Sequence, residues 1–109
     1  MAFDLNALGE VFGDYESPER NKDWERVKTT LMIGTEVMGR VMVRVPFGVF
    51  LDIGFGFPAL IRAPDLRDAD VRPYTSLEMY PAPGSDTRGI VLAFDDRNHQ
   101  VVLTQRKSK

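Results

Sequence analysis

Hydrophobic and polar residues alternate along five short stretches of this 109-residue chain, which is the pattern of β-strands with one face in a core. The longest stretch is "TEVMGRVMVRV", residues 35–45, whose inward face consists of Val37, Val41, Val43 and Val45. Gly39 shares that parity and predicts a bend or a close approach by another element. Four further strands are expected in "VFLDI", "PALIR", "GIVLAF" and "QVVLTQR".

The phenylalanines of "VPFGVFLDIGFGFPALIR", residues 45–62, are expected on different faces of these strands. The parity that suits the core consists of Val49, Leu51 and Ile53. Phe50 therefore shares the opposite face with Asp52, and we expect its ring to be displayed outward. Phe55 and Phe57 flank the turn "GFGF", where we expect partial packing or an exposed loop tip.

A short amphipathic helix is expected ahead of the strands, roughly over residues 18–30. Ser17 before Pro18 and Glu19 is typical of a helix start. Three apolar residues then recur at helical spacing: Trp24, Val27 and Leu31. We interpret Trp24 as the residue that anchors this helix by packing, and the pattern ends before Gly34.

Three segments follow from these patterns. Residues 1–20 form an acidic arm, mobile or loosely docked, with a short helix around residues 6–12. Residues 21–33 hold the amphipathic helix and its lead-in, and residues 34–109 form the folded domain. Residues 63–83 are rich in proline and predict a long connection with about one helical turn.

Five short strands, a long connection between the third and fourth, and glycines at the bends together predict an all-β fold. The pattern favours a small five-stranded Greek-key barrel of the OB-fold type. An SH3-like barrel is the alternative architecture.

The composition excludes several kinds of site. There is no cysteine, so disulfides, thiolate zinc sites and cysteine nucleophiles are ruled out, and His99 alone cannot build a metal cluster. No apolar run approaches the length of a membrane span, and the N-terminus does not resemble a signal peptide, so we expect a soluble cytoplasmic protein. The net charge of −2 is uneven: residues 1–26 carry −4 and residues 27–109 carry +2.

Five stretches occur in an order that is typical of one family: "IGTEVMGRV", "PFGVFLDIG", "PALIRAPDL", "PGSDTRGIVLAFD" and "QVVLTQR". From about Trp24 to Lys107 the chain resembles the S-one domain on these stretches. This domain is the RNA-binding OB-fold repeat of the large ribosomal small-subunit protein, and it also occurs in RNases and initiation factors. The resemblance covers about three quarters of the chain.

The resemblance implies a site for single-stranded RNA, ribosomal or messenger, and with it a ribosome-associated role in translation. The two aromatic residues of the bend correspond to Phe47 and Phe50, and the family's aspartate to Asp95. Arg62 occupies the family's histidine position. Gln100 occupies the arginine position, although Arg97 lies in the same turn. The implied module needs no cofactor and no metal, does not contact a membrane, and is a monomer.

The residue types suit this chemistry. Aromatic rings stack on bases, and cations follow the phosphates of a single strand. A guanidinium such as that of Arg62 can do both. Arg40 and Arg44 could extend a cationic stripe along their strand, or belong to an ordinary solvated face.

Catalysis is disfavoured. Asp95 and Asp96 are adjacent and should point apart at a strand end, and no cysteine or second histidine is available for nucleophilic chemistry. Asp95, Asp96 and Asn98 lack the spacing of a calcium loop with its distal glutamate.

Two functions remain open. The first is a non-catalytic module that binds single-stranded RNA with modest, salt-dependent affinity. The second is a protein-interaction module that has kept the barrel and uses its aromatic face for a protein partner. A further hypothesis is that the acidic arm, residues 4–19, folds over the aromatic face and competes with nucleic acid.

Overall fold

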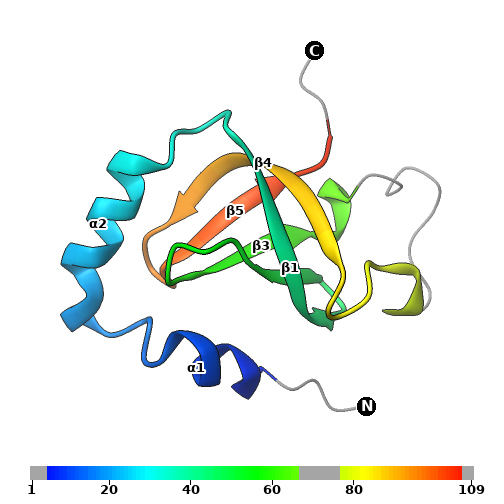
Figure 1. The fold of residues 1–109 in the computed structure, drawn as a ribbon, viewed down its shortest axis with the longest axis horizontal. Helices are drawn as coiled ribbons and strands as arrows, with labels where there is room; N and C mark the ends of the chain where they lie inside the picture. Colours follow the sequence, from blue (N-terminus) through cyan, green and yellow to red (C-terminus); the bar gives the residue numbers. More distant parts are fainter. Residues whose placement is uncertain (1–4, 67–76, 107–109) are drawn as a thin grey trace.

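Five strands close into a barrel in the computed structural model, which describes residues 5–66 and 77–106. The strands are β1 (Glu36–Val45), β2 (Gly48–Asp52), β3 (Pro58–Arg62), β4 (Asp86–Asp95) and β5 (Gln100–Thr104). They are ordered β1-β2-β3-β5-β4 around the barrel, and β3 and β5 pair in parallel while the other pairs are antiparallel (Figure 1). The expected OB-fold architecture is confirmed.

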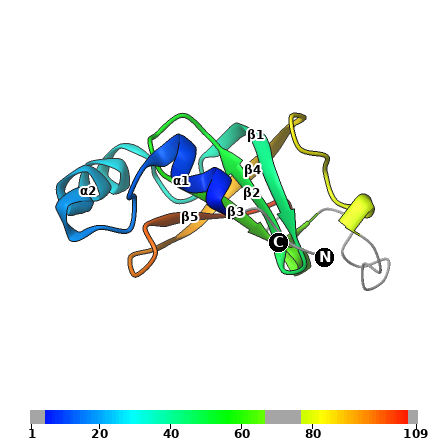
Figure 2. The same ribbon diagram turned by 90° about the horizontal axis from the view of Figure 1, so that it is seen from below.

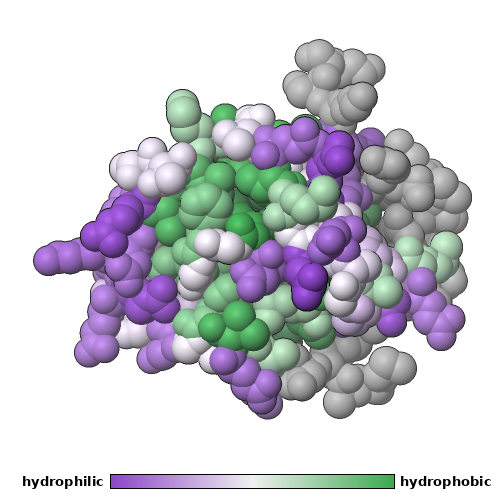
Figure 3. Space-filling view, in the orientation of Figure 1, coloured by the Kyte–Doolittle hydropathy of each residue, from purple (hydrophilic) through white to green (hydrophobic). Residues whose placement is uncertain are grey.

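Helix α2 (Asn21–Thr30) covers one end of the barrel, beside the β2–β3 and β4–β5 turns (Figure 1). Trp24 on this helix is only 1% exposed, and its ring lies 5.1 Å from that of Phe57 and 5.9 Å from that of Phe94. The space-filling view shows hydrophobic residues gathered between α2 and β1, with hydrophilic residues along the outer side of α2 (Figure 3). The interpretation of Trp24 as a packing anchor is confirmed.

The helix begins as the pattern predicts. A single 3-10 turn, η1 (Pro18–Arg20), precedes α2, and the Ser17 side chain accepts a hydrogen bond from the Glu19 N–H at 3.1 Å. The acceptor satisfies one of the backbone donors that every helix start leaves unpaired.

Strand β1 contains a bulge that the alternation does not reveal. Val41 pairs with Leu51, but Val43 pairs with Phe50, so the register shifts by one residue at Met42. Beyond the bulge Val43 shares the outer face of the barrel with Phe50. The expectation that all four valines of β1 share one core face is therefore wrong: Val41 belongs to the barrel core, and Val43 and Val45 belong to a second apolar cluster.

This second cluster lies outside the barrel, under helix α1 (Asn6–Phe12). It consists of Leu8 and Phe12 from the helix and Val43, Val45, Phe50 and Leu60 from the strands. Seen from below, α1 lies across β2 and β3, at a distance from α2 (Figure 2). The helix expected around residues 6–12 is confirmed, and the structure docks it on the barrel.

Two glycines allow close contacts between strands. A Cβ on Gly48 would lie 2.1 Å from the Ile61 carbonyl oxygen, and one on Gly39 would lie 2.8 Å from Cγ2 of Ile53. The close approach expected at Gly39 is confirmed, and Gly48 lets β2 reach β3 directly after the β1–β2 turn.

In its described residues, the connection from β3 to β4 contains the 3-10 turns η2 (Ala63–Asp65) and η4 (Leu77–Met79). The rest of the expected long connection, residues 67–76, lies outside the described residues. In the described ranges, no helix has the length and apolar character needed to cross a membrane.

Asp96 ties the β4–β5 turn to α2. One carboxylate oxygen, Oδ1, accepts hydrogen bonds from Nε1 of Trp24 at 2.8 Å and from Nζ of Lys28 at 2.7 Å. The contact with Lys28, followed by that with Trp24, holds the pKa of Asp96 below its ordinary value. The unfolded chain therefore binds this proton more readily than the folded chain does.

We predict that Trp24→Ala lowers the free energy of unfolding by about 3 to 5 kcal/mol, because it removes the ring at the centre of the α2 contact. Urea denaturation measures this loss. The exposed Met32, in the loop after α2, supplies a control, since Met32→Ala should change stability by less than about 0.5 kcal/mol. Equal effects of the two substitutions would contradict the role of Trp24.

We predict that Asp96→Asn lowers stability at pH 7 by about 0.2 to 1 kcal/mol, since the ion pair is at the surface. The depressed pKa contributes stability that is present above the unfolded value of 3.8 and lost as the pH falls through the folded value. The difference between the two proteins in urea denaturation should therefore shrink at about pH 3. A difference of the same size at both pH values would contradict this account.

Candidate nucleic-acid interface

Phe47 lies in the turn between β1 and β2, and its side chain is 52% exposed. The turn is held from both sides: the Tyr80 hydroxyl donates to the Pro46 carbonyl at 2.7 Å, and the Ala63 N–H donates to the Phe47 carbonyl at 2.7 Å. The ring meets that of Phe50 edge to face, with 5.9 Å between centroids. Phe47 is thus an exposed aromatic ring on a fixed backbone.

Phe50 has the predicted parity but not the predicted exposure. Phe50 pairs in register with Val43 of β1 and with Leu60 of β3, and all three side chains lie on the outer side of the barrel. The ring is nevertheless only 3% exposed, because α1 packs over it. The expectation that Phe50 is displayed to solvent is therefore wrong, and the reason is a long-range contact with the arm.

Arg62 lies beside this aromatic pair, at the end of β3. It pairs in register with Gly48, the residue that follows Phe47. Its guanidinium is exposed and approaches the Asp65 carboxylate at 3.7 Å, longer than a hydrogen bond. Asp65 also accepts from the Thr104 hydroxyl at 3.2 Å. A phosphate near Phe47 would therefore face only weak competition for Arg62.

The β4–β5 turn carries the other predicted site residues. Asp95 and Gln100 are partners in register where the turn begins and ends. The Asp95 carboxylate accepts from the backbone N–H groups of Arg97 and Asn98, each at 3.1 Å, and from the Asn98 amide at 2.9 Å. Asp95 therefore shapes the turn, and Arg97 is exposed on it.

A pocket of about 350 Å³ joins these two regions. Its wall contains four of the predicted site residues, namely Phe47, Phe50, Asp95 and Gln100. The arm supplies part of the remaining wall, through Leu5, Leu8, Tyr15 and Glu16. The structure thus brings these four predicted residues to one surface and places the arm on the same surface.

Tyr15 lies at the polar part of this pocket, whose wall it shares with Gln100. Burial, and after it the neighbouring Glu16, raise the pKa of Tyr15 above its ordinary value, and the side chain of Gln100 offsets part of this rise. The arm therefore lies beside the residue at the family's arginine position.

Arg40 and Arg44 do not form a continuous stripe. Arg40 pairs with Asp52, which lies on the same face of β2 as Phe50. Arg44 pairs with Val49, which lies on the other face of β2, because the bulge of β1 lies between Arg40 and Arg44. Arg40 is exposed and approaches Asp86 at 3.7 Å, and Arg44 is half-buried. The two arginines are therefore not brought together.

Sequence patterns missed the four residues that complete this surface: Leu8, Phe12, Tyr15 and Leu60. The spacing of Leu8 and Phe12 by four residues is a signal that could have indicated a packed helix face. Among the described residues, no group of three or more His, Asp or Glu side chains could hold a metal ion.

Comparison with solved structures supports the fold. GSP13 from Bacillus subtilis superposes with a TM-score of 0.54 at 17% identity, over 72% of this chain and 65% of GSP13. A chain of the a/eIF2alpha-aDim2p-rRNA complex from Pyrococcus horikoshii gives 0.57 at 19% identity, over 69% of this chain and 44% of that one. RNase R from Mycoplasma genitalium, in complex with ribose methylated single-stranded RNA, gives 0.60 at 21% identity, over 79% of this chain and 15% of RNase R.

No family model and no curated protein matches the sequence. The chain spans less than two thirds of the length of each of these three structures, and at these identities the similarity concerns the barrel and its topology. The comparisons therefore show an OB-fold barrel that is shared with proteins solved in RNA complexes.

Proposed function

We propose that this chain is a non-catalytic module of the S-one type that binds single-stranded RNA. The observation that carries the proposal is the exposed ring of Phe47, fixed edge to face on Phe50, with the exposed Arg62 paired in register with the adjacent Gly48. Single-strand sites in OB-folds combine an aromatic ring for base stacking with cations along the phosphates. In this proposal the module is a cytoplasmic monomer and needs no cofactor.

The proposed path of the strand runs from Phe47 and Arg62 towards the β4–β5 turn. The pocket that joins these regions lies between an aromatic end and a polar end formed by Asp95, Asn98 and Gln100. Amide side chains can donate and accept hydrogen bonds at base edges, and carboxylates can accept them. Arg97 then lies where it can approach the backbone of the strand beyond the pocket.

The affinity should be modest. Residues 27–109 carry only +2, so few phosphates can be neutralised by the barrel. Two exposed arginines, Arg62 and Arg97, supply the main cationic contacts of this surface. Binding should therefore weaken as the salt concentration rises.

The neighbouring structures agree with RNA as the ligand class, since one was solved with rRNA in the complex and another with single-stranded RNA. The second candidate function is docking of a protein helix. It is favoured by the apolar cluster on the outer face, which in this chain already holds the amphipathic helix α1. The two functions differ in their dependence on Arg62 and on salt.

We predict that Phe47→Ala weakens binding of a short oligouridylate by about 1 to 3 kcal/mol through the loss of base stacking. Arg62→Ala should weaken binding and reduce the slope of log affinity against log salt by about 1, because one phosphate contact is lost. Fluorescence anisotropy at about 50 and 200 mM salt measures both effects.

Matched controls exist on other elements. Met32 is more exposed than Phe47 and lies after α2, and Arg88 is about as exposed as Arg62 but lies on β4. Met32→Ala and Arg88→Ala should leave RNA binding unchanged. An equal loss in the controls would contradict this site, and the absence of RNA binding by the unaltered chain at both salt concentrations would favour the protein-docking function.

A further inference from the structure

We propose that the arm, residues 5–16, is a built-in competitor that occupies the single-strand site and must leave it when RNA binds. The inference rests on the proposed function and adds to it a means of regulation. It makes the RNA affinity of the whole chain depend on how often α1 leaves the barrel.

The arm covers the site with apolar side chains. Leu8 is 2% exposed and packs with Phe12 against the outer face of the barrel. Their partners include Phe50, the second ring of the proposed stacking platform, and its neighbour Leu60. A base cannot reach Phe50 while Leu8 and Phe12 are in place. Only Phe47 remains accessible, so the docked arm leaves an incomplete site.

Tyr15 extends this cover to the polar end of the site. It lines the joining pocket together with Gln100, and its ring meets that of Phe12 edge to face, with 6.2 Å between centroids. An aromatic ring with a polar edge thus occupies the region proposed for a base. The Tyr15 ring thus takes the place that the proposal gives to a base of the RNA.

The charge of the arm opposes RNA as well. Residues 1–19 contain five Asp or Glu and no Lys or Arg. Glu16 and Asp95 both line the joining pocket. A phosphate that entered this pocket with the arm in place would meet two carboxylates, so the docked arm excludes RNA by repulsion in addition to its bulk.

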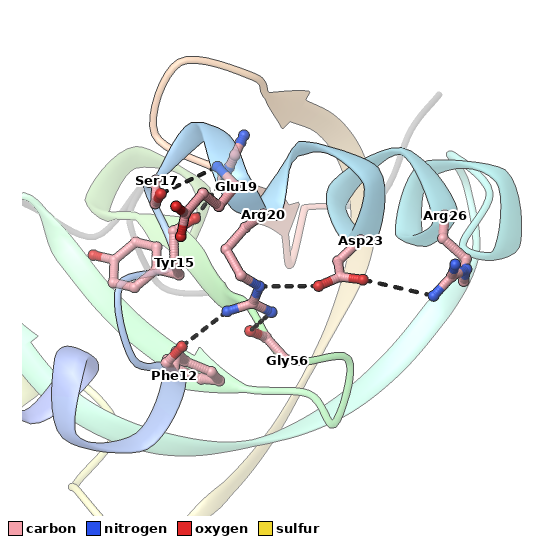
Figure 4. A network of polar contacts seen from close by, with 9 residues as sticks. Phe12, Tyr15, Ser17, Glu19, Arg20, Asp23, Arg26 and Gly56 are labelled. Atoms are coloured by element: carbon pink, nitrogen blue, oxygen red, sulfur yellow. Dashed lines mark hydrogen bonds and ion pairs between the residues drawn. The ribbon is translucent and has the colours of Figure 1, made fainter.

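Two residues hold the C-terminal part of the arm by hydrogen bonds that must break when the arm leaves the site. Arg20 donates to the Phe12 carbonyl at 3.1 Å and to the Gly56 carbonyl at 3.4 Å (Figure 4). Its guanidinium lies 4.4 Å from the centre of the Phe57 ring. His99 donates from Nδ1 to the Tyr15 carbonyl at 2.6 Å. The carbonyls of Phe12 and Tyr15 are therefore each held by one of these hydrogen bonds, while the rest of α1 is held by side-chain packing.

Helix α1 itself is poorly stabilised. It has seven residues and no side-chain hydrogen bond at its N-cap, Leu5. Isolated helices of this length are unstable in water, so α1 depends on the burial of Leu8 and Phe12. Elements with few buried contacts open at a small fraction of the global free energy of unfolding. The arm therefore has the properties of a cover that can open without unfolding the barrel.

Salt should shift the competition towards the arm. Docking of α1 rests on apolar contacts, which salt does not screen. The proposed contacts of RNA phosphates with Arg62 and Arg97 are electrostatic, so salt weakens them. In the presence of RNA, we therefore expect the arm to stay docked at high salt and to exchange with RNA at low salt.

The test compares two substitutions on opposite sides of α1 in the full chain. Leu8→Ala removes a buried contact of the arm, and Val11→Ala alters a side chain that is 55% exposed on the same helix. Alanine does not lower the helix propensity at either position. The probe is a short fluorescein-labelled oligouridylate at about 50 mM salt, followed by anisotropy. The indole N–H of Trp24, the only tryptophan, reports by NMR that the barrel core remains folded.

We expect Leu8→Ala to tighten RNA binding by about tenfold or more, because a closed state populated above about 90% reduces the apparent affinity by that factor. Val11→Ala should bind like the unaltered chain. Phe12→Ala provides a second opened variant if Leu8→Ala perturbs the Trp24 signal.

Equal RNA affinity in all of these proteins would overturn the competition and leave the proposed function standing. No RNA binding in any of them, with the Trp24 signal intact, would overturn the proposed function and the competition together. Weaker binding in Leu8→Ala would show that the arm contributes to the site, and would also overturn the competition.

Discussion

The bulge in β1 is the constraint on which the rest of the structure depends. By shifting the register between Val41 and Val43, it moves Val43 and Val45 from the barrel core to its outer face, beside Phe50 and Leu60. The barrel thereby gains an apolar strip on a surface that would otherwise be solvated. Such a strip is costly to leave in contact with water, and the chain covers it with its own helix α1.

The same strip explains why two ligand classes suit this surface. An aromatic and aliphatic face with cations nearby can stack on the bases of a nucleic acid. The same face can also pack against the apolar side of a helix, and that contact needs no cations. Phe47 and Arg62 remain exposed at the edge of the covered area, where a nucleic acid can make its first contact. The arm engages the remainder through Leu8, Phe12 and Tyr15. In the proposal, regulation and recognition therefore use neighbouring residues of one surface.

Local patterns predicted the barrel, because each strand alternates within its own length and Trp24 recurs with its neighbours at helical spacing. The bulge escaped because the valines of β1 continue their alternation through Met42, and only the pairing with β2 shows the shift. The burial of Phe50 escaped for a different reason. Its face follows from parity, but its cover comes from residues more than 35 positions earlier in the chain, and no local pattern specifies that contact. The roles assigned to Arg62, Arg97 and Gln100 remain predictions.

The most direct test is an amide NMR titration of the labelled full chain with a short single-stranded oligouridylate at about 50 mM salt. The account predicts that residues 6–12 lose their helical shifts at the same RNA concentration at which Phe47, Phe50 and Arg62 move, since one event displaces α1 and fills the site. Shifts at Phe47 and Arg62 with the resonances of α1 unchanged would contradict the competition between arm and RNA. Shifts confined to other faces of the barrel would contradict the site itself.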